Sequence, residues 1–80
     1  MTQDKVNQIM SSARYYMVDG RYFIDLPDLY SYDLWHASCT TWEGLDTYLS
    51  HQVCTSFGSD EQMWRTIRAR AAQFFSNLNT

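Results

Sequence analysis

The residues from position 59 onward constrain the fold most strongly, because their apolar side chains recur at helical spacing for about four turns. This stripe consists of Met63, Trp64, Ile67, Ala71, Phe74, Phe75 and Leu78. Ser59 and Gln62 form a capping box at its start, and Gly58 is expected to end the preceding helix. A long amphipathic helix must bury its stripe against other elements, so the chain is expected to pack around its C-terminal helix.

A second helix is predicted directly before it. Thr40 and Glu43 form a capping box, which places Thr40 at the N-cap. The apolar face of this helix carries Trp42, Leu45, Leu49 and Val53.

The first residues also show helical periodicity. Their apolar positions are Val6, Ile9, Met10, Ala13, Tyr16 and Met17, with Thr2 available as N-cap. Asp19-Gly20 is either the stop of this helix or the two-residue turn of a hairpin. Because the stripe runs to Met17, we favour the helix stop.

Residues 21–37 are predicted to form a β-hairpin. RYFIDL (21–26) and LYSYDLWHA (29–37) alternate and are rich in aromatic or β-branched residues. In the second strand, Tyr30, Tyr32, Leu34 and His36 would share one face. Pro27-Asp28 suits the intervening type I turn, although a short helix starting at Pro27 is an alternative.

These elements predict an α+β fold for residues 1–80 as a single compact domain: a helix, a β-hairpin, then two helices, with the helices covering one face of the sheet. The alternative is an all-α four-helix bundle, in which residues 21–37 form a helix instead of the hairpin.

Both histidines and both cysteines occur in His-x-x-Cys pairs, at residues 36–39 and 51–54. Two such pairs suggest a zinc site, which needs four ligands within about 2.3 Å of one ion. Cys39 precedes the predicted helix, however, and Cys54 lies near its far end, so about 16–20 Å of helix separates the pairs. We therefore expect no metal and two free thiols, with His51 and Cys54 pointing outward. A later helix start, or a dimer pairing both motifs across chains, would leave zinc open.

The sequence contains no motif of a catalytic or nucleotide-binding site. Its three glycines, Gly20, Gly44 and Gly58, are explained by helix ends or helix positions and form no phosphate loop. No third side chain orients either His/Cys pair for nucleophilic catalysis. We expect a protein that is not an enzyme and that uses no cofactor.

The last two helices also permit a helix-turn-helix interpretation, in which Arg65, Arg68 and Arg70 contact DNA. Asp60 and Glu61 stand in the first turn of that helix, where phosphates would approach, and their carboxylates repel DNA. A DNA-binding regulator is therefore an alternative rather than the main prediction.

The charges favour a protein partner. Although the net charge is only −3, no Lys or Arg occurs between Tyr22 and Trp64, where all the charged side chains are acidic. Acidic charge steers association with basic partners, and Tyr and Trp are enriched at interface hot spots. The predicted partner-binding residues are Asp25, Asp28, Tyr30, Tyr32, Asp33, Trp35, Glu43 and Asp46.

A basic nucleic-acid-handling protein or nucleoprotein complex is the expected partner, with no direct contact to nucleic acid and a homodimer as a further possibility. Short, acidic domains without catalytic motifs are typical of phage and mobile-element proteins that block host defence, such as anti-CRISPR proteins. We therefore expect an inhibitor of that type. The sequence contains neither an apolar run of roughly 18 residues nor a secretory signal, so a cytoplasmic location without membrane contact is expected.

Overall fold

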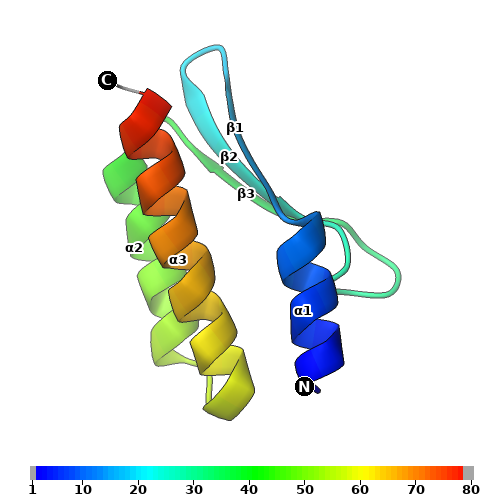
Figure 1. Ribbon diagram of the computed structural model, residues 1–80. Helices are drawn as coiled ribbons and strands as arrows, with labels where there is room; N and C mark the ends of the chain where they lie inside the picture. Colours follow the sequence, from blue (N-terminus) through cyan, green and yellow to red (C-terminus); the bar gives the residue numbers. More distant parts are fainter. Residues whose placement is uncertain (1, 79–80) are drawn as a thin grey trace.

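The computed structural model describes residues 2–78 and shows three helices and a three-stranded antiparallel sheet (Figure 1). The elements, in chain order, are α1 (Gln3–Ser12), β1 (Arg14–Val18), β2 (Arg21–Leu26), β3 (Trp35–Cys39), α2 (Trp42–Cys54) and α3 (Gly58–Leu78). The predicted α+β class is confirmed, and the alternative four-helix bundle is wrong.

The first helix is shorter than predicted and is followed by a strand. Helix α1 ends at Ser12, and β1 pairs with β2 through a turn at Asp19 and Gly20, whose φ angles are +52° and +78°. Two positive φ angles at adjacent turn residues match the twist of a tight hairpin, and Asp-Gly suits them. The prediction that Asp19-Gly20 stops a helix was therefore wrong, because pairing with β2 outweighs the helical spacing of Tyr16 and Met17.

The second predicted strand begins later than expected. β3 starts at Trp35, and residues 27–34 form turns and bends instead of a hairpin turn followed by a strand. Leu29 is buried in the core, and its backbone N–H bonds to the carbonyl of Leu26 at 3.3 Å. This anchor interrupts the alternation, so the predicted strand face shared by Tyr30, Tyr32 and His36 does not exist.

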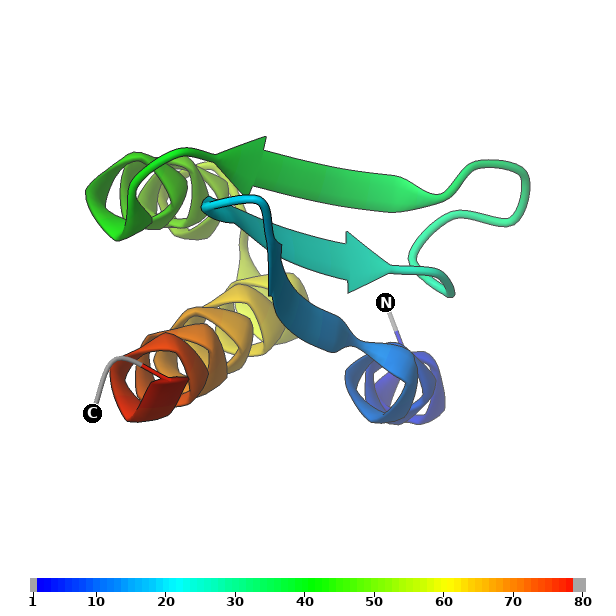
Figure 2. The same ribbon diagram turned by 90° about the horizontal axis from the view of Figure 1, so that it is seen from above.

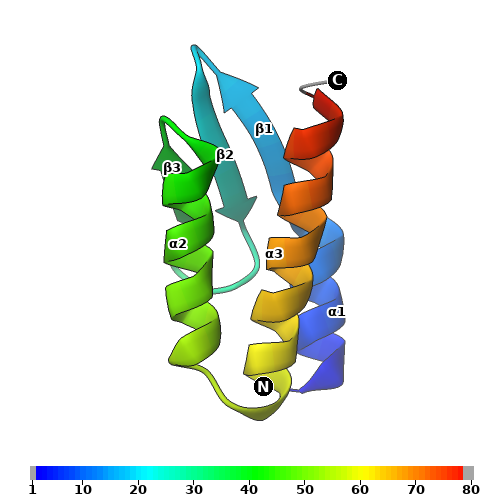
Figure 3. The same cartoon turned by 90° about the vertical axis from the view of Figure 1, so that its left-hand side faces the viewer.

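Helices α2 and α3 lie side by side on one face of the sheet, and α1 packs beside α3 near one end of the sheet (Figure 3). Alternate residues of the strands point into this helical layer. The buried core consists of Val6, Ile9, Ile24, Leu26, Leu29, Leu45, Leu49, Val53, Met63, Trp64, Ile67, Ala71 and Phe75. Because both helices lie on the same side, the other face of the sheet stays open.

The helix starts differ slightly from the predicted ones. Thr41, not Thr40, caps α2: its hydroxyl accepts a bond from the backbone N–H of Gly44 at 3.1 Å. Helix α3 begins at Gly58, so Ser59 lies inside the helix rather than at its N-cap. Helix α2 already ends at Cys54.

Candidate functional site

Four of the predicted partner-binding residues lie in one exposed loop between β2 and β3. We call residues 27–34 the acidic loop; it contains Asp28, Tyr30, Tyr32 and Asp33. Tyr32 is 98% exposed and Tyr30 57% exposed, while Asp33 is exposed and Asp28 half-buried. The loop therefore presents large aromatic side chains to solvent between two carboxylates.

The acidic loop is held at its base and free at its tip. Leu29 enters the core and ties the start of the loop to β2. The remainder projects past the end of the sheet, away from α2 and α3 (Figure 2). Leu34, which sequence reasoning did not include, is 56% exposed and adds apolar area to the same loop. Its place in the sequence, between Asp33 and Trp35, could have indicated it, but that segment was predicted to be a strand.

The carboxylates of the acidic loop have no basic partner. Within residues 2–78, no salt bridge involves Asp28 or Asp33. The last Lys or Arg before the loop is Arg21, and the first one after it is Arg65. A carboxylate without a basic neighbour can attract a basic partner.

Asp25 lies elsewhere, on the open face of the sheet. Its carboxylate accepts a hydrogen bond from the hydroxyl of Tyr16 at 2.8 Å, and Arg14 faces it across the β1–β2 pair. This bond, followed by burial and the charge of Asp25, raises the pKa of Tyr16, while Arg14 lowers it. Asp25 therefore belongs to a surface different from the acidic loop.

Trp35 is part of the packing beneath the sheet. Its ring lies 5.1 Å from that of Trp64 and 5.8 Å from that of Tyr48, centroid to centroid. It fixes the C-terminal end of the acidic loop to α2 and α3 rather than offering a free surface.

The two predicted residues on α2 differ from the loop residues. Asp46 holds Arg68 of α3 in a two-pronged ion pair, with N···O distances of 2.6 and 3.1 Å. This hydrogen bond raises the pKa of Arg68. Glu43 is exposed in the first turn of α2. The predicted surface thus divides into the acidic loop, Asp25 on the sheet, and separate positions on β3 and α2.

The His-x-x-Cys pairs do not form a cluster. Among residues 2–78, no three His, Cys, Asp or Glu side chains lie close enough to hold a metal ion. Cys39 ends β3 and is half-buried, whereas Cys54 ends α2 and is exposed, as is His51. Both cysteines are free thiols, and His51 and Cys54 point outward as predicted.

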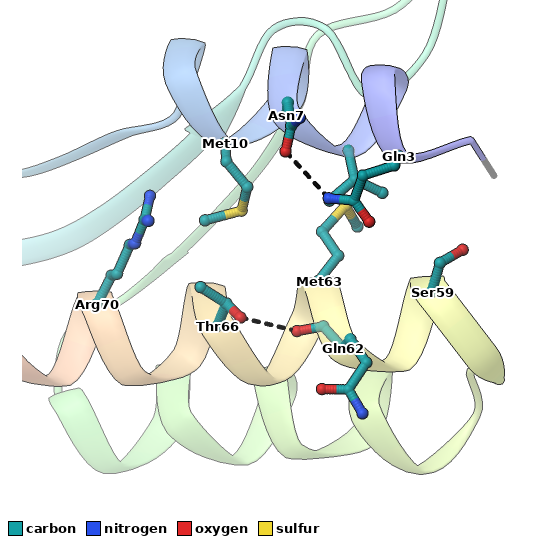
Figure 4. A pocket seen from close by; sticks show the side chains of 9 residues that line it. Gln3, Asn7, Met10, Ser59, Gln62, Met63, Thr66 and Arg70 are labelled. Carbon is teal, nitrogen blue, oxygen red and sulfur yellow. Dashed lines mark hydrogen bonds between the residues drawn. The ribbon is translucent and has the colours of Figure 1, made fainter.

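The arginines considered for DNA binding are engaged on or beside α3. Arg65 pairs with Glu61 at 3.2 Å, and Arg68 is held by Asp46. Arg70 lines a groove of 270 Å³ between α1 and α3 (Figure 4). Arg65 and Arg68 line one hollow together with Asp46, whereas Arg70 faces a different groove, so the three side chains do not share one phosphate-binding surface.

The groove between α1 and α3 was not foreseen, because the sequence does not indicate that these helices lie side by side. Its apolar lining is Val6, Met10 and Met63, and its polar lining is Gln3, Asn7, Ser59, Gln62, Thr66 and Arg70. The Gln3 amide donates to Asn7 at 3.0 Å, so part of the polar rim is already satisfied internally (Figure 4).

No known family model, curated protein or solved structure matches this chain. The residues and their geometry therefore carry the functional argument. No helix within residues 2–78 has the length and apolar character needed to cross a membrane.

Proposed function

We propose that this protein is a non-catalytic binding module whose acidic loop docks onto a basic site of a protein partner. The observation that carries the proposal is the exposure of Tyr32, at 98%, between unpaired Asp28 and Asp33. In a folded domain, an aromatic side chain held almost entirely in water has no role in the domain's own packing.

The composition of the loop suits a hot spot. Tyr30, Tyr32 and Leu34 supply apolar area, which a partner pocket would remove from water. The two aspartates supply negative charge that accelerates encounter with a basic surface and fixes the orientation. Leu29 and Trp35 hold the two ends of the loop, which lowers the entropy cost of binding.

Basic surfaces are typical of proteins that handle nucleic acid. A chain that covers such a site prevents nucleic acid from entering it, which is inhibition without catalysis. We therefore propose an inhibitor of a nucleic-acid-handling protein, of the phage or mobile-element anti-defence type, that acts in the cytoplasm. Size and charge, rather than any sequence relationship, support the analogy with anti-CRISPR proteins.

The test compares three tagged chains as bait for host proteins, with mass spectrometry as readout. The loop variant carries Asp28→Asn, Tyr32→Ala and Asp33→Asn. The matched control carries Asp4→Asn, Asp19→Asn and Phe57→Ala, which removes two exposed carboxylates and one exposed aromatic ring elsewhere. Thermal melts by circular dichroism establish that both variants fold.

We expect a basic nucleic-acid-binding protein to be retained by the native and control chains and lost from the loop variant. The retained protein, once purified, should bind a labelled oligonucleotide less tightly when the native chain is added, as measured by fluorescence anisotropy. Equal retention by native and loop-variant chains would show that the acidic loop is not the binding site. Retention without any effect on nucleic-acid binding would contradict the inhibitor proposal.

A further inference from the structure

The face of the sheet opposite α2 and α3 carries a set of side chains that the core does not use. We call it the open face. It consists of Arg14, Tyr16 and Val18 of β1, Arg21, Phe23 and Asp25 of β2, and His36 and Ser38 of β3. None of these residues is buried. Two of the six Lys and Arg residues of this chain, Arg14 and Arg21, lie here. The open face has one carboxylate, that of Asp25, which already accepts a hydrogen bond.

An aromatic stack crosses the middle of the open face. The rings of Tyr16 and Phe23 are 5.0 Å apart, centroid to centroid, and nearly parallel, with 4° between their planes. β1 is an edge strand, and Phe23 lies on the neighbouring strand β2. One face of the Tyr16 ring therefore stacks on Phe23, and the opposite face points away from the sheet, past its β1 edge. An open hollow of 490 Å³ adjoins this edge strand, lined by Arg14, Tyr16 and Asp25 from the open face and by Tyr15 from the inner face.

We propose that the open face binds single-stranded nucleic acid, with one nucleobase stacked on the free side of Tyr16 and the backbone phosphates paired with Arg14 and Arg21. Aromatic side chains on a sheet, flanked by arginines, are the means by which small domains bind unpaired bases. This inference goes beyond the proposed function of the acidic loop and uses different residues.

The dimensions of the open face suit a short stretch of nucleic acid. Five residues along a strand and three strands across give roughly 17 by 14 Å. About two or three nucleotides would fit within that length.

The distribution of charge agrees with this occupant. Arg14 and Arg21 stand at opposite ends of the face, about 13 Å apart along the strands, with the aromatic stack between them. Arg21 is held across the sheet by a bond to the hydroxyl of Ser38 at 3.2 Å. A strand of nucleic acid running along β1 would meet the Arg14 guanidinium near one end, the Tyr16 ring midway and the Arg21 guanidinium near the other end.

Asp25 gives the hollow a preference among bases. One of its carboxylate oxygens accepts from Tyr16, and a carboxylate can accept further donors. The exocyclic amino group of cytosine is such a donor, whereas thymine presents only a carbonyl oxygen at that position. The open face should therefore prefer cytosine to thymine.

Fluorescence anisotropy with labelled oligodeoxycytidylate and oligothymidylate of equal length tests the proposal. The face variant carries Arg14→Gln and Arg21→Gln, and the matched control carries Lys5→Gln and Arg65→Gln, which removes the same charge elsewhere. We expect the face variant to bind about tenfold more weakly or worse, and the control to bind as the native chain does. Tyr16→Leu should weaken binding about tenfold through lost stacking.

Two further readouts separate this proposal from nonspecific attraction. For two phosphate contacts on a single strand, log K should fall with log salt at a slope of roughly −1.4, and the slope should approach zero in the face variant. Asp25→Asn should abolish the preference for cytosine, because the amide can also donate to thymine.

Three results would overturn the proposal. The first is no change in anisotropy at millimolar native protein in low salt. The second is equal loss of binding in the face variant and the matched control. The third is a native dimer, seen by sedimentation, that Arg14→Gln and Arg21→Gln dissociate, since the open face would then be occupied by a second copy. None of these results bears on the acidic loop, which lies outside the face variant.

Discussion

The two faces of the sheet are built from alternate residues of the same strands, yet their surroundings are opposite. On the inner face, Ile24 and Leu26 are fully buried in the core that the helices cover. On the outer face, their neighbours Phe23 and Asp25 remain accessible. Neighbouring residues of a strand point to opposite faces of the sheet. The helices cover only one of these faces, so the position of the helical layer decides which of two neighbours stabilises the fold and which is free to bind.

The largest test of this comparison substitutes neighbouring residues on opposite faces. Ile24→Ala should lower the free energy of unfolding by about 2–5 kcal/mol, because Ile24 is 0% exposed and its removal leaves a cavity. Phe23→Ala should cost about 1 kcal/mol, mostly lost stacking on Tyr16. Urea denaturation followed by circular dichroism measures both values. Equal losses would show that the open face is as important for stability as the core.

A second pair of neighbours sharpens the comparison for tyrosine hydroxyls. The Tyr15 hydroxyl is buried without a hydrogen-bond partner among the described residues. Tyr15→Phe should therefore raise the free energy of unfolding by about 1 kcal/mol, since an unsatisfied polar atom is removed. Tyr16→Phe, in contrast, removes the bond to Asp25 and should lower stability slightly. Urea midpoints compare the two variants, and a destabilised Tyr15→Phe would contradict the assigned environment.

The pH dependence of stability provides a third test. Burial raises the pKa of Tyr15 above its ordinary value of 10.0, although Arg70 opposes the shift. The stability associated with the neutral phenol is fully present below the unfolded pKa and is lost as pH rises through the higher folded pKa. The native chain should thus lose stability above pH 10.0, and Tyr15→Phe should lose less of it. Urea titrations between about pH 8 and pH 11 measure the difference, and parallel curves would contradict it.

The smallest expected effect concerns the charged ends of the open face. Arg14→Gln and Arg21→Gln should each change the free energy of unfolding by less than about 0.5 kcal/mol, because both side chains are exposed. Equilibrium denaturation checks this value. A larger loss would mean that these arginines hold the sheet together, in which case weaker oligonucleotide binding by the face variant would have a structural cause.

The sequence predicted the elements with local signals and failed where two periodicities overlapped. Helices α2 and α3 were expected within two residues of their observed starts, because capping side chains and apolar stripes act over a few residues. Tyr15 and Met17 occupy the inner face of β1, but Tyr16 and Met17 also continue the helical stripe of α1. Spacing alone therefore favoured a longer helix, and β1 was missed.

The candidate site was predicted only in part, because sequence patterns report on residues that are close along the chain. Asp28, Tyr30, Tyr32 and Asp33 are close in sequence, so a single loop holds them together whatever its conformation. Asp25 and Asp46 carry the same charge, but the fold gives them partners: the Tyr16 hydroxyl and the Arg68 guanidinium. Because these partners lie 9 and 22 residues away along the chain, no local pattern could identify them.

Local sequence determines the helical C-terminal half of this protein and the chemistry of its acidic loop. The segment from Ala13 to Leu34 is settled by contacts between distant residues. Pairing of β1 with β2 ends the first helix, burial of Leu29 prevents the second strand from starting early, and α2 and α3 cover one face of the sheet. Free energy from buried apolar area and strand pairing depends on the whole chain, whereas capping and periodicity depend on a few neighbouring residues.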